Sequence, residues 1–275
     1  MRIAVVSDGI SDDLEEAIEL GLRLGVDAYE LRWLRRPGAW GRQRVGELSD
    51  EAACAVAEVA ARRGVAISAL SPGLFHSVWS DASELEGQMA RLERCLRLAE
   101  ILGTTQIVVY GFLPPAGRRN GVCPPQLLEV LSQAAGRASA AGMRLLLRNA
   151  PDCYCDSGAH TGSVVHAVRA PALGVSWDPC HAARVGERAI CEGYEWVAPF
   201  VCDVRVRDQR QQDELGYEYT VLDQGCMDWP GQLRALVADG YQGTVTVDSP
   251  LEPRLLNTLH NLEALRGLLR AAQGA

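Results

Sequence analysis

A glycine that ends a helix and is followed at once by a short apolar run recurs through the first half of the chain. These glycines are Gly25, Gly64, Gly103 and Gly142. Glycine favours the left-handed conformation in which helices often end, because it has no Cβ. A repeated helix end followed by a strand predicts alternating helices and strands, and therefore parallel strands joined by right-handed crossovers.

Eight strands are expected from the apolar runs, at residues 2–7, 27–32, 65–71, 105–111, 143–149, 174–178, 202–208 and 244–248. Helices are expected at about 11–24, 49–63, 82–102, 124–141, 161–169, 228–239 and 253–272, with an irregular segment at 185–200 and a polar excursion at 209–219. Eight such units are typical of a (β/α)8 TIM barrel. An open doubly wound sheet is the alternative, but it usually carries a G-x-G-x-x-G loop after its first strand, which Ser7–Asp13 lacks. No linker divides the chain, so we predict a single TIM-barrel domain over residues 1–275.

The composition argues against several classes of protein. The formal charge is −8, which disfavours a binder of nucleic acid, since such proteins need a concentrated basic surface. No apolar run is long enough to span a bilayer, and no signal-peptide pattern precedes the first strand. Nine cysteines without the spacing of a disulfide framework suit reduced thiols, so we expect a cytoplasmic protein. From the charge and the short apolar runs, we expect neither nucleic-acid nor membrane partners.

Apolar residues alternate with small or charged residues along several of the expected strands. These strands end in a charged residue that lies on the side opposite the apolar residues. In Gly174–His181, Asp178 stands at the strand end and His181 follows three residues later. The other strands contribute a larger set: Arg148, Arg205 or Arg207, Asp248, Glu30, Arg32 and, after the third strand, His76. Barrel active sites lie where the C-terminal strand ends meet, so we expect these side chains to gather at one mouth. A purely structural salt-bridge lattice is the competing interpretation.

The same alternation predicts which strand residues face the helices and which face the barrel interior. The set expected against the helices is Leu145, Leu147, Val175, Trp177, Val204, Val206, Val245 and Val247. The set expected inside is Arg144, Leu146, Arg148, Gly174, Ser176, Asp178, Asp203, Arg205, Arg207, Thr244, Thr246 and Asp248.

Seven short motifs support a resemblance to one superfamily through their order and spacing. They are Ala28–Arg32, Leu102–Val109, Gly142–Arg148, Val175–His181, Val204–Asp208, Gln224–Asp228 and Val245–Asp248. The chain resembles the sugar phosphate isomerase/epimerase superfamily, the xylose isomerase-like barrels. That superfamily includes inosose dehydratases, hydroxypyruvate isomerases, ketose 3-epimerases and the endonuclease IV type of DNA-repair enzyme, of which the last is least expected here because of the charge balance.

Members of this superfamily hold a divalent metal with Glu, Asp, His and Glu at the ends of strands five to eight. The resemblance places Arg148, Asp178, Arg205 and Asp248 at these positions, and His181 matches a histidine after the sixth strand. Arginine stays charged and cannot ligate a metal. A divalent ion ~5 Å from one guanidinium would be repelled by roughly 7 kcal/mol at an effective dielectric of about 20. We therefore expect the metal of the superfamily to be lost. The alternative is that Mn²⁺, Mg²⁺ or Zn²⁺ binds at a relocated site formed by Asp178, His181 and Asp248.

Two functions fit such a site. The first is a metal-independent isomerase or epimerase of a small sugar-like or hydroxy-acid substrate. Its substrate-binding residues would be Arg148, Arg205, Arg207 and His76, because arginine clamps carboxylate and phosphate groups. Its catalytic residues would be Asp178, His181, Asp248 and Glu30, which could move a proton next to a carbonyl.

The second function is a non-catalytic small-ligand-binding or regulatory barrel whose former metal site is closed by salt bridges. Pairing of the arginines with Asp178 and Asp248 would favour this function, whereas arginines splayed around an anion would favour the first. A small polar or anionic ligand is the expected partner in both.

Two further features leave alternatives open. Cys153, Cys155, His160, Cys180 and His181 could meet around a soft ion such as Zn²⁺, although C-x-C is not the usual spacing and reduced loop thiols are the simpler interpretation. The three tryptophans after the second and third strands could line a pocket or an intersubunit contact, which would allow a homodimer: Trp33, Trp40 and Trp79.

Overall fold

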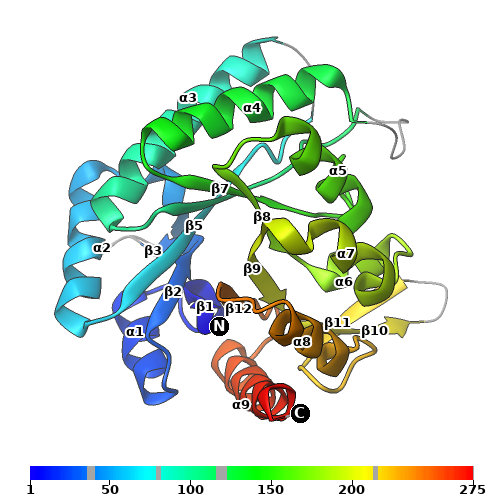
Figure 1. Ribbon diagram of the computed structural model, residues 1–275. Coiled ribbons are helices and arrows are strands. Elements are labelled where there is room, and N and C mark those ends of the chain that lie inside the picture. The colour runs from blue at the N-terminus through cyan, green and yellow to red at the C-terminus, as the bar shows by residue number, and fades with distance from the viewer. Residues whose placement is uncertain (36–40, 79–81, 116–122, 213–215, 275) are drawn as a thin grey trace.

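The computed structural model describes residues 1–35, 41–78, 82–115, 123–212 and 216–274, and its central feature is a closed barrel of parallel strands. The strand order around the barrel is β1-β12-β9-β8-β7-β6-β5-β2 (Figure 1). The bounds are β1 (Arg2–Val6), β2 (Ala28–Leu31), β5 (Ala66–Leu74), β6 (Gln106–Val109), β7 (Arg144–Arg148), β8 (Leu173–Trp177), β9 (Val201–Val206) and β12 (Thr244–Val247). Strand β1 closes the barrel by pairing in parallel with both β12 and β2. The predicted (β/α)8 TIM barrel is confirmed.

Helices follow the strands and surround the barrel in Figure 1. Their bounds are α1 (Leu14–Arg23), α2 (Asp50–Arg63), α3 (Ala82–Leu102), α4 (Pro125–Ala140), α5 (Gly158–Val168), α6 (Pro179–Arg184), α7 (Tyr194–Val197), α8 (Trp229–Ala238) and α9 (Arg254–Gln273). In the part of the chain that the structure describes, no helix is both long enough and apolar enough to cross a membrane.

The glycine repeat has the conformation that the sequence predicts. The φ angles are +69° at Gly25, +67° at Gly64, +68° at Gly103 and +69° at Gly142. Each of these residues follows a helix and turns the chain into the next barrel strand. The repeat therefore marks the helix-to-strand corners of the barrel.

On strands β7, β8, β9 and β12 the predicted outward face is confirmed, and the predicted inward face is confirmed except at Arg144, which is exposed where β7 begins. The residues expected to face the helices all belong to the large apolar core between strands and helices. Inside the barrel, a separate small cluster contains Ala69, Val108 and Leu146. Polar residues also face the interior, where Ser176 donates to Asp203 at 2.7 Å.

Two hairpins were missed by the sequence analysis. Strands β3 (Trp33–Arg35) and β4 (Arg42–Arg44) pair antiparallel after β2, and β10 (Asp208–Gln212) pairs with β11 (Gly216–Thr220) after β9. The second hairpin occupies the expected polar excursion, whose alternating polar residues carry no apolar signal. Trp40 and Trp79 lie outside the described residues.

Two helix boundaries also differ from expectation. Helix α1 begins at Leu14 because the Asp13 carboxylate, and not Ser11, accepts the main-chain N–H of Glu16. Helix α5 begins at Gly158, three residues early, because the Ser157 hydroxyl caps it. In both cases several residues could serve as the cap, and side-chain placement decides between them.

Replacing Gly142 by alanine should lower the free energy of unfolding by about 1 kcal/mol, because a Cβ at φ +69° is strained even with no described atom within 4 Å. Gly136 is the matched control, since it is exposed within α4 and also has no described neighbour within 4 Å. Gly136→Ala should instead raise the free energy of unfolding by roughly 0.5–1 kcal/mol. Urea denaturation measures both, and a stabilising Gly142→Ala would contradict the left-handed corner.

Candidate functional site at the barrel mouth

The charged residues that the strand-end rule selected lie together at the C-terminal mouth and inside the barrel, and they are buried. None of six predicted site residues is more than 6% exposed: Glu30, Arg148, Asp178, Arg205, Arg207 and Asp248. Charges buried this deeply are stable only when they are paired and hydrogen-bonded. We call the resulting network the ion-pair lattice, and it consists of these six residues with Asp8, Arg32 and Asp203.

Asp178 caps α6 and connects several parts of the lattice. Its Oδ2 accepts from Arg148 Nη2 at 2.8 Å and from Arg207 Nη2. Its Oδ1 accepts the main-chain N–H of His181 at 3.1 Å. The Asn149 amide fixes the main chain, because it donates to the Asp178 carbonyl at 2.9 Å and accepts from the Asp178 N–H at 2.8 Å.

Asp248 extends the lattice to the first two strands. Its Oδ2 accepts from Arg148 Nη2 at 3.0 Å, so Arg148 bridges Asp178 and Asp248. Its Oδ1 accepts from Arg32 Nη1 at 3.0 Å. The same Arg32 fork contacts both Asp8 oxygens, at 3.1–3.2 Å.

Arg205 forms a second, deeper part of the lattice. Its two terminal nitrogens donate to the two Glu30 oxygens at 2.9 and 2.5 Å, a two-point pair in which both side chains are at most 1% exposed. Its Nε donates to the Ser176 hydroxyl at 3.0 Å and lies 3.1 Å from Asp203 Oδ2. Asp203 also accepts from Thr246 at 2.5 Å. This part of the lattice braces the barrel interior.

The hydrogen-bond partners of His181 settle its tautomer. Nδ1 lies 2.8 Å from the Asn149 carbonyl, which can only accept, so Nδ1 carries the proton. Nε2 lies 2.7 Å from Arg207 Nη2, which can only donate, so Nε2 accepts. Burial lowers the pKa of His181 to about 3, and the Arg207 and Arg148 guanidinium groups act in the same direction. His181 is therefore neutral at pH 7, and Arg207 occupies its basic nitrogen.

Four carboxylates of the lattice fall into two groups. Burial works against ionisation of Asp178 and Asp248, but the surrounding arginines outweigh it and hold both pKa values below the usual range. Burial raises the pKa of Glu30 and of Asp8, and their arginine partners offset this only in part. In the geometry described, each of these four carboxylates already accepts hydrogen bonds from arginine.

The residues at the family's metal position do not fit a divalent cation. Arg148 and Arg205 place positive charge where the resemblance expects ligands. The oxygens of Asp178 and Asp248 that would remain as ligands already accept from guanidinium groups. A cation there would meet repulsion from the arginines and would have to displace existing pairs.

The β10–β11 hairpin covers part of the mouth. The Tyr219 ring lies 4.9 Å from the Arg207 guanidinium and 4.0 Å from that of Arg184, measured to the ring centroid. At its base, the Asp208 carboxylate accepts main-chain N–H groups from the segment that follows, including Gly225 at 3.1 Å and Met227 at 3.2 Å. Sequence reasoning missed Tyr219 because the hairpin itself was not predicted.

Two lattice residues, Asp8 and Asp203, and the neighbouring Asn149 were not among the predicted site residues. Asp8 directly follows the first expected strand and Asn149 is the last residue of the fifth, so a wider strand-end rule would have selected both. Asp203 was placed inside the barrel, but its partners Arg205 and Thr246 become evident only in three dimensions.

The structure places His76 apart from these ion pairs. Its Nε2 lies 3.1 Å from Asp152 Oδ2, and its ring lies 4.5 Å from that of Tyr110. The five Cys and His residues suggested for a soft ion do not form one cluster among the described residues. Cys153 instead groups with His76 and Asp152.

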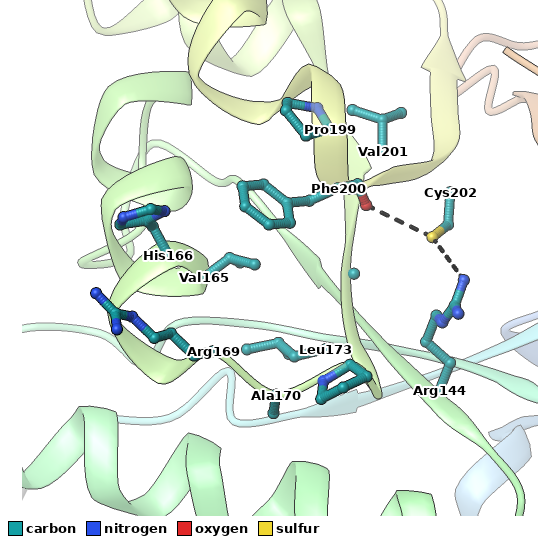
Figure 2. Close-up of a pocket in the computed structure, with 12 residues that line it drawn as sticks. Arg144, Val165, His166, Arg169, Ala170, Leu173, Pro199, Phe200, Val201 and Cys202 are labelled. Carbon is teal, nitrogen blue, oxygen red and sulfur yellow. Dashed lines mark hydrogen bonds between the residues drawn. The ribbon is translucent and has the colours of Figure 1, made fainter. Parts of the chain in front are cut away.

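A cavity of about 470 Å³ lies at the opposite end of the barrel, where β7, β8 and β9 begin. Figure 2 shows Arg144 donating to the Cys202 sulfur, a contact of 3.3 Å, beside Phe200. His166 and Arg169 approach from the end of α5. This N-terminal end of a TIM barrel usually serves stability and not catalysis, so the mouth is the candidate functional site.

The closed eight-stranded barrel with a polar C-terminal mouth defines the chain as a TIM-barrel protein. The family model described as "Xylose isomerase-like TIM barrel" matches residues 18–268, and the chain belongs to this family. A search of curated proteins found no match.

Solved structures of the same fold are similar over nearly the whole chain. A probable 3-DHS dehydratase, AsbF from Bacillus anthracis, has a TM-score of 0.76 at 12% identity and covers 97% of this chain and 99% of its own. D-psicose 3-epimerase from Clostridium cellulolyticum H10 has a TM-score of 0.76 at 14% identity, with 99% of each chain covered. A xylose isomerase-like TIM barrel protein from Mycobacterium smegmatis in complex with magnesium has a TM-score of 0.73 at 20% identity, covering 94% and 89%. At these identities the likeness establishes the fold alone.

The free energy of unfolding should depend on pH through His181. The native pKa of about 3 lies below the unfolded value of about 6.5, so between these values the unfolded state binds more protons. The stabilisation that neutral His181 contributes is therefore fully present above pH 6.5. It is lost as the pH falls, by up to about 1.4 kcal/mol per pH unit. Urea denaturation from pH 7.5 to 5 should show this slope in the wild type and a shallower one in His181→Gln.

His260→Gln is the control, because it removes an exposed imidazole of α9 that lies outside the mouth. It should keep the wild-type slope. Equal slopes in the wild type and in His181→Gln would contradict the neutral, buried state assigned to His181.

Proposed function

We propose that this chain is a metal-independent binding barrel for a small polar, anionic ligand, with its site at the C-terminal mouth. The observation that carries the proposal is the pairing of the mouth arginines. Arg148 and Arg207 pair with Asp178, and Arg148 also with Asp248. Arginine thereby supplies the positive charge that a metal supplies in the superfamily, and no divalent cation is needed to hold the acids together.

The lattice also keeps unused donor capacity. The Nε–H groups of Arg148 and Arg207 are buried and have no hydrogen-bond partner among the described atoms. A buried donor without a partner costs roughly 1–3 kcal/mol, and an anion that accepts from it would recover this cost. Arginine recognises carboxylate and phosphate groups especially well because its donors form a planar fork.

The β10–β11 hairpin would control entry to this site. Arg207 is only 6% exposed, and the Tyr219 ring lies over its guanidinium. A ligand that contacts Arg207 must therefore displace Tyr219 or enter beside it. Ligand exchange in this proposal is coupled to movement of the hairpin.

Calorimetric titration with inorganic phosphate, fructose 6-phosphate and malate tests the proposal. At least one probe should bind saturably, and Arg207→Met should weaken its binding at least tenfold because an anion contact is lost. Arg207→Lys keeps the charge but loses the planar fork of donors. Its affinity should lie between those of the wild type and Arg207→Met. Thermal melting without ligand checks that each variant folds.

Arg144→Met is the matched control, since Arg144 lies at the opposite end of the barrel and lines the cavity there. It should leave the affinity within twofold of the wild type. The proposal fails if no probe binds, if Arg207→Met binds as tightly as the wild type, or if Arg144→Met abolishes binding.

An isomerase or epimerase is the second candidate, and the contact between His181 and Arg207 favours it. An anionic substrate that drew Arg207 away would free the lone pair of His181 Nε2 for proton abstraction. Asp178, Asp248 and Glu30 could then take part in moving protons, with Arg148 and Arg205 stabilising the developing negative charge. A 3-epimerase and a probable dehydratase are among the proteins with a similar fold, which supports this class of chemistry.

Proton NMR in deuterated water distinguishes the two candidates. With fructose, psicose or fructose 6-phosphate, an isomerase or epimerase should exchange a C–H proton next to the carbonyl for deuterium. His181→Gln should slow this exchange at least a hundredfold while substrate binding persists. Absence of exchange in substrates that do bind would reject the second candidate and leave the binding barrel.

A further inference from the structure

A group of three potential metal ligands lies on the loops that follow β5 and β7. His76 Nε2 is 3.1 Å from Asp152 Oδ2, and Cys153 Sγ is 3.7 Å from Asp152 Oδ1. One ligand atom from each of the three residues lies within 4.8 Å of the others, and no second group of this kind occurs in the described ranges. None of the three belongs to the ion-pair lattice.

Two separations in this group are close to those between ligands of a tetrahedral zinc ion. With Zn–N and Zn–O bonds of about 2.0–2.1 Å, nitrogen and oxygen ligands stand about 3.3 Å apart, and a sulfur at about 2.3 Å stands about 3.5 Å from an oxygen. His76 Nε2 lies 3.1 Å from Asp152 Oδ2 and Cys153 Sγ lies 3.7 Å from Asp152 Oδ1, each within a few tenths of an ångström of these values. The two contacts are to different oxygens, so a rotation of the Asp152 carboxylate is needed to place one oxygen beside an ion shared with His76 and Cys153.

Main-chain hydrogen bonds hold the loops that carry these ligands. The Phe112 N–H donates to the Phe75 carbonyl at 2.9 Å, which fixes the residue before His76. The Tyr154 N–H donates to the Phe112 carbonyl at 2.9 Å, which fixes the residue after Cys153. The loops after three successive barrel strands are thereby joined, so little ordering is required when an ion binds.

The ligand types select the kind of ion. Imidazole, carboxylate and thiolate together suit Zn²⁺, whereas Mg²⁺ and Ca²⁺ prefer oxygen ligands alone. Cys153 is fully buried, and burial raises the pKa of its thiol, so the metal must displace the thiol proton to water as the sulfur–metal bond forms. The His76 and Asp152 side chains are 36% and 57% exposed, which leaves room for a water molecule as the fourth ligand.

We propose that His76, Asp152 and Cys153 form a binding site for a thiophilic divalent cation of the Zn²⁺ type. The site would connect the loops after β5 and β7 at the rim of the mouth. It lies outside the superfamily's metal position and is independent of the proposed function. It also gives His76 a different role from the substrate-binding one expected from the sequence.

Cobalt titration of the chelator-treated full-length protein tests this proposal, because thiolate bound to Co²⁺ gives a charge-transfer band in the near ultraviolet. One equivalent of Co²⁺ should produce this band together with the visible bands of a tetrahedral ion, and Zn²⁺ should abolish both by competition. Cys153→Ser should remove the charge-transfer band, and His76→Ala should weaken Co²⁺ binding at least tenfold.

Cys54→Ser is the matched control, since Cys54 is exposed on α2 and lies outside the cluster. It should keep the wild-type spectrum and affinity. Thermal melting without metal verifies that each variant folds. If Cys153→Ser does not fold, the His76→Ala variant decides the outcome. The proposal is overturned if no charge-transfer band forms, if the band survives in Cys153→Ser, or if His76→Ala binds Co²⁺ as tightly as the wild type.

Discussion

The buried contact of one Arg148 nitrogen with both Asp178 and Asp248 is the interaction on which the mouth depends. Arg148 is 3% exposed, and an unpaired guanidinium at this depth would be very costly. The two carboxylates that compensate it come from different strands, after β8 and after β12, and β7 is not a neighbour of β12 in the sheet. Closure of the barrel brings these three groups together at one mouth, so the pairing depends on the fold.

The pair between Arg205 and Glu30 has the same character at a deeper level. Arg205 belongs to β9 and Glu30 to β2, strands that are separated in the sheet by β12 and β1. The side chains therefore cross the interior and connect opposite walls. A barrel filled with aliphatic side chains is held mainly by non-directional packing, whereas here directional, charged contacts also determine how the strand ends face one another.

The sequence predicted the barrel because its signals are local and repeated. Helix-ending glycines and alternating apolar residues act within a few positions of the chain, and the same phase identified the charges that meet at the mouth. The ion-pair partners of these charged residues could not be predicted from such local patterns. Whether Arg205 contacts Asp178 or Glu30 depends on strand tilt and side-chain reach, and the link between His181 and Arg207 depends on a rotamer. Tyr219 was missed because the hairpin that carries it has no apolar pattern.

Arg148, which donates hydrogen bonds to both Asp178 and Asp248, also constrains how such a chain can evolve. Exchange of Arg148 for glutamate alone would change the local charge by two units and place a third carboxylate beside Asp178 and Asp248. Exchange of Arg205 alone would leave Glu30 and Asp203 buried without their cation. Each single exchange therefore leaves a buried charge without its partner, although a combined change of arginine and carboxylate need not. The buried charged positions of the mouth are thus expected to vary together as groups and not one at a time.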